Sequence, residues 1–282
     1  MSRRPISGHT RVAAVLGWPS EHSLSPAIHN AGFESLEVDW TYVALPTPPE
    51  RLGSVLDLCR GGSIAGASVT MPLKTLAYES MDHLTDAARV LRSVNTVSMD
   101  DGLLIGHSTD GDGLVDALLE EAVSLVGASV FLLGWGGAAR SVADAVKRAG
   151  ADRVLITNRS GTDADELQSI VPDSLAVPWS ERGDVCSEID IVINCTSVGM
   201  GGDPSLPLDP SRLEPSTTVV DLVYHPLDTP FMVSARRHGC RVVGGLGMLV
   251  HQAARQQEIW LGRRPDASIM KAQALQALAE RR

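Results

Sequence analysis

A glycine-rich segment between a strand-like run and a helix-like run is the feature that most limits the fold of this chain. Residues 129–133 are almost continuously apolar and predict a buried strand, and residues 138–149 have the periodicity of a helix. Between them, Gly134-Trp135-Gly136-Gly137-Ala138-Ala139 follows the pattern G-x-G-x-x-G/A in the strand, turn and helix context that this pattern requires. The segment therefore predicts a βαβ unit that binds a dinucleotide.

Such a segment binds a dinucleotide through its backbone. Glycines permit a tight turn and a close approach to the ligand, and the helix N-terminus offers N–H groups to a pyrophosphate. We expect five residues to contact the cofactor, namely Gly134, Trp135, Gly136, Gly137 and Ala138. Trp135 is bulky for its position and limits how closely the cofactor can approach. A turn with only a packing role is the structural alternative.

The end of the next predicted strand indicates which dinucleotide binds. In NAD-binding units an acidic residue at about this place accepts hydrogen bonds from the ribose hydroxyls. Here the residues starting 24 positions after Gly134 are Asn158-Arg159-Ser160, with no carboxylate. A guanidinium between two hydrogen-bonding side chains suits a dianionic 2'-phosphate, so these three residues predict NADP. The alternative interpretation is that Arg159 only caps the end of the strand.

Apolar runs alternate with helical periodicity along the whole chain and predict two α/β domains. The 282 residues agree with two domains at about 150 residues each. Strands are expected at 11–17, 40–45, 64–69, 94–99, 103–107, 129–133, 153–157, 189–194, 218–222 and 241–243. Helices are expected at 26–36, 49–59, 114–123, 138–149, 246–261 and 266–279. Since two final helices cannot close a sheet, we expect them to fold back on the first domain.

Composition excludes several classes of protein. The 24 Lys and Arg residues against 34 Asp and Glu residues give a net charge of −10, which argues against a nucleic-acid partner. The longest apolar runs, about five residues, are too short for a membrane span, and the N-terminus lacks the features of a signal peptide. The four cysteines form no C-x-x-C pair, so neither a disulfide framework nor a metal site is expected. We expect a cytoplasmic protein, either a monomer or a homodimer.

Polar residues at predicted strand ends suggest a second ligand. Ser23 and Ser25 precede a helix that has Pro26 in its first turn, where hydroxyls and N–H groups could bind a carboxylate. A serine N-cap is an equally good interpretation. Lys74 and Asp110 stand at two further junctions, where each by itself is typical of a solvated charge.

Taken together and in order, these clusters resemble the shikimate dehydrogenase family from Gly17 to Gln252. The matching segments are 17–30 (GWPSEHSLSPAIHN), 68–74 (SVTMPLK), 94–96 (VNT), 108–113 (STDGDG), the glycine segment, 158–160 (NRS), 194–200 (NCTSVGM), 221–226 (DLVYHP) and 245–252 (GLGMLVHQ).

The resemblance implies reversible reduction of 3-dehydroshikimate to shikimate by NADPH, in the pathway to chorismate and the aromatic amino acids. It implies a substrate and catalytic domain of residues 1–112 and 247–282 and a Rossmann-type NADP domain of residues 113–246. Because the dinucleotide motifs lie between two sets of substrate motifs in the chain, we expect the active site in the cleft between the domains. It implies that Lys74 and Asp110 form the catalytic pair. Substrate contacts are implied for Ser23, Ser25, Thr70, Asn95, Tyr224 and Gln252, and further cofactor contacts for Thr196, Leu222 and Gly245.

Three residues depart from the family pattern. Ser68 and Ser108 each stand where the family usually has Asn, and both keep a short hydrogen-bonding side chain. Asp163 stands where many NADP-using members have a second Arg, and a like charge near a phosphate is unfavourable. The preference for NADP is therefore expected to be weaker than Arg159 alone indicates.

Two other functions fit the sequence. One is a quinate/shikimate dehydrogenase that prefers NAD, which activity on quinate with each cofactor would reveal. The other is a catalytically silent dinucleotide-binding module, which would need neither Lys74 nor Asp110.

Overall fold

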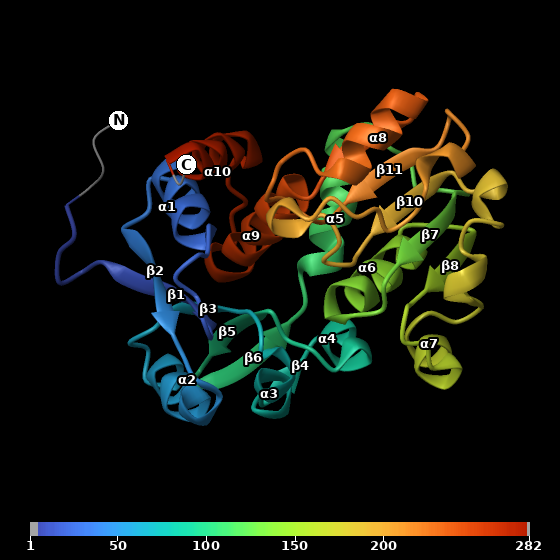
Figure 1. The fold of residues 1–282 in the computed structure, drawn as a ribbon. Coiled ribbons are helices and arrows are strands. Elements are labelled where there is room, and N and C mark those ends of the chain that lie inside the picture. Colours follow the sequence, from blue (N-terminus) through green and yellow to red (C-terminus); the bar gives the residue numbers. More distant parts are fainter. Residues whose placement is uncertain (1–4, 281–282) are drawn as a thin grey trace. The chain divides into compact units, whose positions relative to one another are not determined.

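The computed structural model describes residues 5–280. The chain divides into two compact units, one formed by the residues up to Thr109 together with those from Val250, the other by Asp110–Leu249. Each unit is built on its own six-stranded sheet, with helices packed on it (Figure 1). The predicted α/β fold with two sheets is confirmed.

The sheet of the first unit is mixed, in the order β2-β1-β3-β5-β6-β4. Its strands are β1 (Arg11–Gly17), β2 (Trp40–Pro46), β3 (Gly66–Val69), β4 (His83–Leu84), β5 (Thr96–Asp100) and β6 (Leu103–His107). The strands β5 and β6 form a hairpin, whose two turn residues, Asp101 and Gly102, have φ angles of 46° and 79°. Positive φ at both positions is what a two-residue turn of type I′ requires. The two residues of β4 are too few to show an alternation, and the sequence did not predict this strand.

Successive residues of β1 point to opposite faces of this sheet and enter different cores. Ala14 and Leu16 belong to the core beneath α2 (Leu52–Arg60), α3 (Lys74–Glu79) and α4 (Asp86–Leu91). Ala13 and Val15 pack with Phe33 of α1 (Ser25–Ser35) on the other face. Because both faces are covered, β1 reads as a continuous apolar run rather than as an alternating one.

The sheet of the second unit is entirely parallel, in the order β12-β11-β10-β7-β8-β9. Its strands are β7 (Ser129–Leu133), β8 (Arg153–Thr157), β9 (Leu175–Val177), β10 (Ile191–Asn194), β11 (Thr218–Asp221) and β12 (Arg241–Gly244). The chain starts at β7 in the middle, adds β8 and β9 on one side, and returns to add β10, β11 and β12 on the other. In such Rossmann-type sheets, ligands bind where the strand order reverses, which here is between β7 and β10.

The helices of the second unit are α5 (Asp110–Glu120), α6 (Gly137–Arg148), α7 (Ala164–Ile170) and α8 (Pro230–His238). Helices α5 and α6 approach closely at Gly111, whose N–H donates to the Ser141 hydroxyl at 2.8 Å. A Cβ atom on Gly111 would lie 2.0 Å from the carbonyl oxygen of Ser141, so only glycine fits there. The contact lies in the first turn of α5, whose first residue is Asp110.

The last two helices are α9 (Leu246–Leu261) and α10 (Ala267–Glu280). Helix α10 lies beside α1 in the first unit (Figure 1), and Trp260 near the end of α9 donates from Nε1 to the carbonyl of Val97 at 3.1 Å. The predicted return of these helices to the first domain is confirmed.

The units join at 109/110 and 249/250, where the sequence analysis placed the boundaries at 112/113 and 246/247. The first junction coincides with the start of α5, and the second lies inside α9. A helical pattern continues unchanged across the second junction, so periodicity does not show that the packing there changes from one unit to the other.

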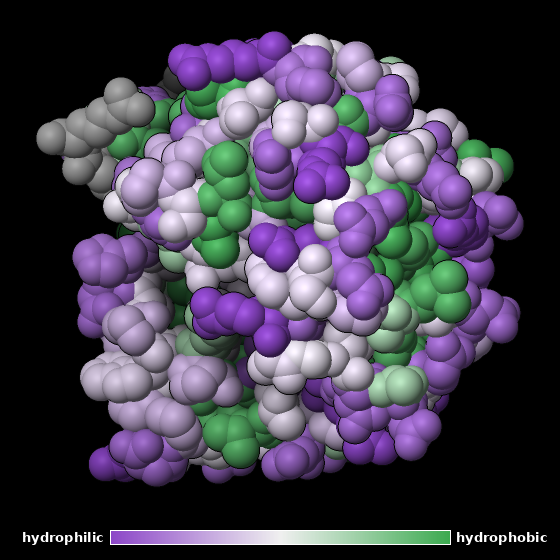
Figure 2. Space-filling model, turned by 45° about the vertical axis from the view of Figure 1, so that its right-hand side comes forward, coloured by the Kyte–Doolittle hydropathy of each residue, from purple (hydrophilic) through white to green (hydrophobic). Residues whose placement is uncertain are grey.

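Apolar side chains reach the surface as patches separated by polar residues on the face that Figure 2 shows. Two large apolar side chains that are exposed belong to neighbouring residues. Trp18 is 50% exposed and Met71 77%, and the N–H of Trp18 donates to the carbonyl of Met71 at 3.2 Å. Among residues 5–280, no helix has both the length and the apolar composition that a membrane span needs.

Candidate active site

Backbone contacts gather the predicted substrate residues of the first unit at the ends of neighbouring strands. The N–H of Thr70 donates to the carbonyl of Leu16 at 2.9 Å, which places the lysine segment beside the end of β1. A Cβ atom on Gly17 would lie 2.3 Å from Cγ2 of Thr70, so this close approach requires glycine. The carbonyl of Lys74, the first residue of α3, accepts from the N–H of Val94 at 3.1 Å. Three sequence motifs that are far apart along the chain thus meet at one edge of the sheet.

Ser23 and Ser25 lie at the start of α1. The N-cap residue is Leu24, without a side-chain cap, and Ser25 is the first helical residue. The hydroxyl of Ser23 accepts from the N–H of Ser25 at 3.1 Å. The alternative of a plain serine N-cap does not match this geometry, because neither serine occupies the N-cap position.

Asn95 and Gln252, two of the predicted substrate residues, both contact Thr109, the residue before Asp110. Its Oδ1 accepts from the N–H of Thr109 at 2.9 Å, and its Nδ2 donates to the Thr109 hydroxyl at 2.9 Å. The same hydroxyl reaches the backbone carbonyl of Gln252 at 3.3 Å. Asn95, Thr109 and Gln252 are therefore brought together, and Asp110 follows directly in the chain. Asp110 and Tyr224 belong to the second unit.

A chain of buried hydrogen bonds that the sequence did not reveal ends at Gln252. The Tyr42 hydroxyl donates to Oγ of Ser68 at 2.6 Å, and Ser68 donates to Oε1 of Gln256 at 2.6 Å. Gln256 in turn donates from Nε2 to Oε1 of Gln252 at 2.9 Å and to the backbone carbonyl of Asn95 at 3.3 Å. Gln252 and Gln256 are four residues apart on α9, a spacing that places them on the same face and is the signal that could have indicated the pair.

His29 supports this chain from α1. Its ring stacks on that of Tyr42, with 4.1 Å between the centroids and 3° between the planes. Its Nδ1 lies 3.2 Å from Nε2 of Gln257. Burial lowers the pKa of His29 to about 3, so the ring is neutral near pH 7.

The lowered pKa of His29 predicts a loss of stability in mild acid. The unfolded chain takes up the proton below pH about 6.5 but the folded chain only near 3, so stability falls by about 1.4 kcal/mol per pH unit across this window as pH decreases. Urea unfolding of wild type and of His29→Gln at pH 7.5 and pH 5 measures the effect. The wild type should lose about 2 kcal/mol more than the variant on acidification. Equal losses would show that His29 does not titrate as described.

In the second unit the glycine segment makes a tight turn directly after β7. Gly134 has a φ of 106°, and a Cβ atom on it would lie 3.0 Å from Thr196 and 3.3 Å from Cys195, so the turn lies directly against the end of β10. Gly136 is the N-cap of α6 without a side-chain cap, and both Gly136 and Gly137 are exposed. The first N–H groups of α6 therefore have no side-chain acceptor at the cap, which fits an anionic ligand.

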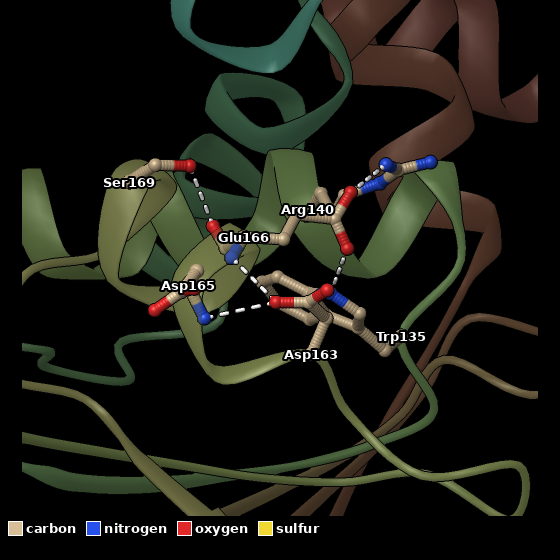
Figure 3. A network of polar contacts seen from close by, with 6 residues as sticks. All are labelled: Trp135, Arg140, Asp163, Asp165, Glu166 and Ser169. Carbon is tan, nitrogen blue, oxygen red and sulfur yellow. Dashed lines mark hydrogen bonds and ion pairs between the residues drawn. The ribbon is translucent and has the colours of Figure 1, made fainter.

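Trp135 and Arg140 are both held by one carboxylate (Figure 3). Trp135 donates from Nε1 to Oε2 of Glu166 at 2.9 Å, and Arg140 forms an ion pair with the same side chain. Glu166 lies in the first turn of α7. The indole is thus turned toward α7, and the backbone of the following glycines remains exposed.

Arg159 lies exposed just beyond β8 and has no hydrogen-bond or ion-pair partner within the described part of the chain. Asn158 beside it donates from Nδ2 to the Ser160 hydroxyl at 3.0 Å, which holds this turn together. Asp163 is the N-cap of α7, and its Oδ1 accepts from the N–H groups of Asp165 and Glu166 at 2.9 and 3.0 Å (Figure 3). The departure from the family pattern at this position therefore has a structural role.

The remaining predicted cofactor residues follow β10, β11 and β12. The hydroxyl of Thr196 donates to Oδ1 of Asn194 at 2.6 Å, and Nδ2 of Asn194 donates to Asp221 at 2.9 Å. Burial raises the pKa of Asp221, against the effect of its hydrogen bonds. A Cβ atom on Gly245 would lie 2.2 Å from the carbonyl oxygen of Leu222, so these two segments require glycine at their contact.

Family models match three segments of this chain. The shikimate dehydrogenase substrate binding domain matches residues 15–97, shikimate/quinate 5-dehydrogenase residues 116–200, and the shikimate 5′-dehydrogenase C-terminal domain residues 245–275. The shikimate dehydrogenase (NADP⁺) of Citrifermentans bemidjiense is 40% identical, over 94% of this chain and 95% of its own. The chain belongs to the shikimate dehydrogenase family.

Solved structures agree with this assignment. Shikimate 5-dehydrogenase from Thermus thermophilus, in complex with NADP(H) and shikimate, is 36% identical with a TM-score of 0.87, covering 95% of this chain and 100% of that one. Quinate dehydrogenase from Corynebacterium glutamicum, in complex with NAD, is 27% identical with a TM-score of 0.86, covering 95% and 99%. One structure similar to this chain is thus named for quinate and was solved with NAD.

Proposed function

We propose that this protein is an NADP-dependent oxidoreductase that interconverts 3-dehydroshikimate and shikimate in the pathway to chorismate and the aromatic amino acids. The observation that carries the proposal is that one chain combines Lys74, Asn95 and Gln252 at one edge of the first sheet with an exposed glycine turn and Arg159 in the second unit. A dinucleotide-binding module without activity would need only the second set. The 40% identical relative that is named for shikimate and NADP⁺ supports the same choice.

NADPH would supply the hydride. The N–H groups at the start of α6 would bind the pyrophosphate, since Gly136 leaves them without a side-chain cap. Arg159 would pair with the 2′-phosphate, because its guanidinium is exposed and has no partner among residues 5–280. Thr196, Leu222 and Gly245 follow the strands on the other side of the reversal point and would contact the rest of the cofactor.

Lys74 would act on the carbonyl oxygen of the substrate. When hydride reaches the carbonyl carbon, negative charge develops on the oxygen, and an ammonium group can stabilise this charge and then donate its proton. Asp110 would hold the amine in place, as the family resemblance implies. Asn95 would help to position Asp110, because its side-chain amide forms hydrogen bonds with Thr109, the residue before Asp110.

Replacement of both serines at the start of α1 should weaken substrate binding. Ser23→Ala with Ser25→Ala removes two hydroxyls that would hold the carboxylate in the ground state and in the transition state alike, so KM for shikimate should rise while kcat changes little. One hydrogen bond to a charged group contributes about 1.5 to 3 kcal/mol, so the rise should be at least about tenfold. Steady-state kinetics measures it. A variant whose kcat falls while KM stays constant would contradict this assignment.

The proposed function is tested by following the reduction of NADP⁺ and of NAD⁺ at 340 nm, with shikimate and with quinate in parallel. Activity should be highest with shikimate and NADP⁺. Higher activity with quinate and NAD⁺ would favour the alternative that the Corynebacterium glutamicum structure represents. No activity with any of the four pairs would overturn the proposal.

A further inference from the structure

We propose that Tyr42, Ser68 and Gln256 are positioning residues that orient the side-chain amide of Gln252, so that it presents its nitrogen as a hydrogen-bond donor to an oxygen of the substrate. The inference rests on the proposed function, in which Gln252 contacts the substrate. All four side chains belong to the first unit and are buried, with exposures of 2% for Tyr42, 6% for Ser68, 1% for Gln256 and 8% for Gln252.

The direction of each hydrogen bond from Tyr42 to Gln252 follows from one backbone group. The carbonyl of Asn95 can only accept, and it lies 3.3 Å from the side-chain amide of Gln256, so the nitrogen of that amide must face it. The oxygen of Gln256 therefore faces Ser68, and Ser68 must donate to it. Since Ser68 has one proton, it must accept from the Tyr42 hydroxyl.

The same logic determines the orientation of Gln252. The nitrogen of Gln256 that faces Asn95 also lies 2.9 Å from Gln252, so Gln252 must turn its oxygen toward it. The nitrogen of Gln252 then points away from Gln256. A donor at this place selects a substrate atom that can accept, such as the oxygen of a hydroxyl or of a ketone.

Two further features hold the Tyr42 hydroxyl in place as the donor at the start of these hydrogen bonds. The ring of Tyr42 is held by the stacked ring of His29, with 4.1 Å between the centroids. Burial raises the pKa of Tyr42, which keeps its hydroxyl protonated and able to donate. Reversal would also place the oxygen of the Gln256 amide against the backbone carbonyl of Asn95, two acceptors with no proton between them, which is costly where water cannot compensate.

A double-mutant cycle between Ser68 and Gln252 tests the proposal. Ser68→Ala should raise KM for shikimate about 2- to 10-fold, the range for one neutral hydrogen bond, with kcat changed less than about twofold. Gln252→Ala should raise KM at least as much. If Ser68 acts through Gln252, Ser68→Ala should change KM less than about twofold when Gln252 is already absent. Effects that multiply in the double variant would overturn the proposal.

Shape-matched variants separate the hydroxyl from the packing. Ser68→Thr keeps the hydroxyl and Ser68→Val replaces it with a methyl of the same size, so KM should rise only in the second. Gln256→Glu cannot donate as a carboxylate, so it should turn the amide of Gln252 around and raise KM most. Ser174→Ala is the control, because Ser174 is also buried and its hydroxyl donates to the carbonyl of Val171 in the second unit. Equal KM values for the Thr and Val variants would count against a positioning role.

Neutron diffraction after exchange into D₂O tests the orientation without any assay. Deuterons on the side of Gln256 that faces Asn95, and on the side of Gln252 that points away from Gln256, are expected. Deuterons of Gln256 directed at Ser68 would overturn the proposal. This result is independent of turnover, so it distinguishes a wrong orientation from a wrong substrate.

Discussion

Lys74→Ala should lower kcat for shikimate oxidation with NADP⁺ by about 10² to 10⁴, the usual contribution of a positioned acid or base. The lysine would act mainly in the transition state, where the oxygen of the reacting carbon carries its charge, whereas the serine hydroxyls and Gln252 would already hold the ground-state substrate. KM should therefore change much less than kcat. Steady-state kinetics at saturating cofactor measures both constants.

Two further lysine variants define the role of Lys74. Lys74→Arg keeps a positive charge but gives up its proton far less readily, so it should not restore kcat. Lys147→Ala is the matched control, because Lys147 is also half-buried and donates to the carbonyl of Asp152 on the second unit. A Lys74→Ala enzyme that keeps nearly full kcat would remove Lys74 from the proposed chemistry.

Arg159→Ala should weaken NADP⁺ binding by about 10- to 150-fold and leave NAD⁺ binding nearly unchanged. The variant loses a charged hydrogen bond to the 2′-phosphate, which contributes about 1.5 to 3 kcal/mol, while the glycine turn that would bind the pyrophosphate is untouched. Titration of each cofactor by calorimetry measures the two dissociation constants.

Arg153→Ala is the control for Arg159. It removes an arginine from the other end of β8, where the side chain pairs with Glu188 at 3.1 Å, so both dissociation constants should stay as in the wild type. Equal losses of affinity for NADP⁺ and NAD⁺ in Arg159→Ala would contradict a contact with the 2′-phosphate.

Asp163 shows how a residue can be misjudged when only its charge is considered. By sequence it is a carboxylate close to the expected phosphate, yet in the structure it caps α7 through two backbone N–H groups. The signal was present, because an Asp followed by Glu166 three residues later is typical of a helix N-terminus. The substitution of the usual Arg therefore stabilises a helix start directly after the turn that contains Arg159.

Elements with a local cause could be predicted from the sequence alone. Strands 11–17, 129–133 and 153–157 and the helix 246–261 have the predicted bounds, because long apolar runs and glycine-marked ends depend only on neighbouring residues. The glycine turn, Arg159 and the family motifs are local in the same sense. The hydrogen bonds that connect Tyr42, Ser68 and Gln256 depend on the fold, since Ser68 and Gln256 are 188 positions apart and meet only when α9 returns to the first sheet. Hydrogen bonds between distant segments leave no periodic trace in the sequence, so the orientation of Gln252 could be inferred only from the folded chain.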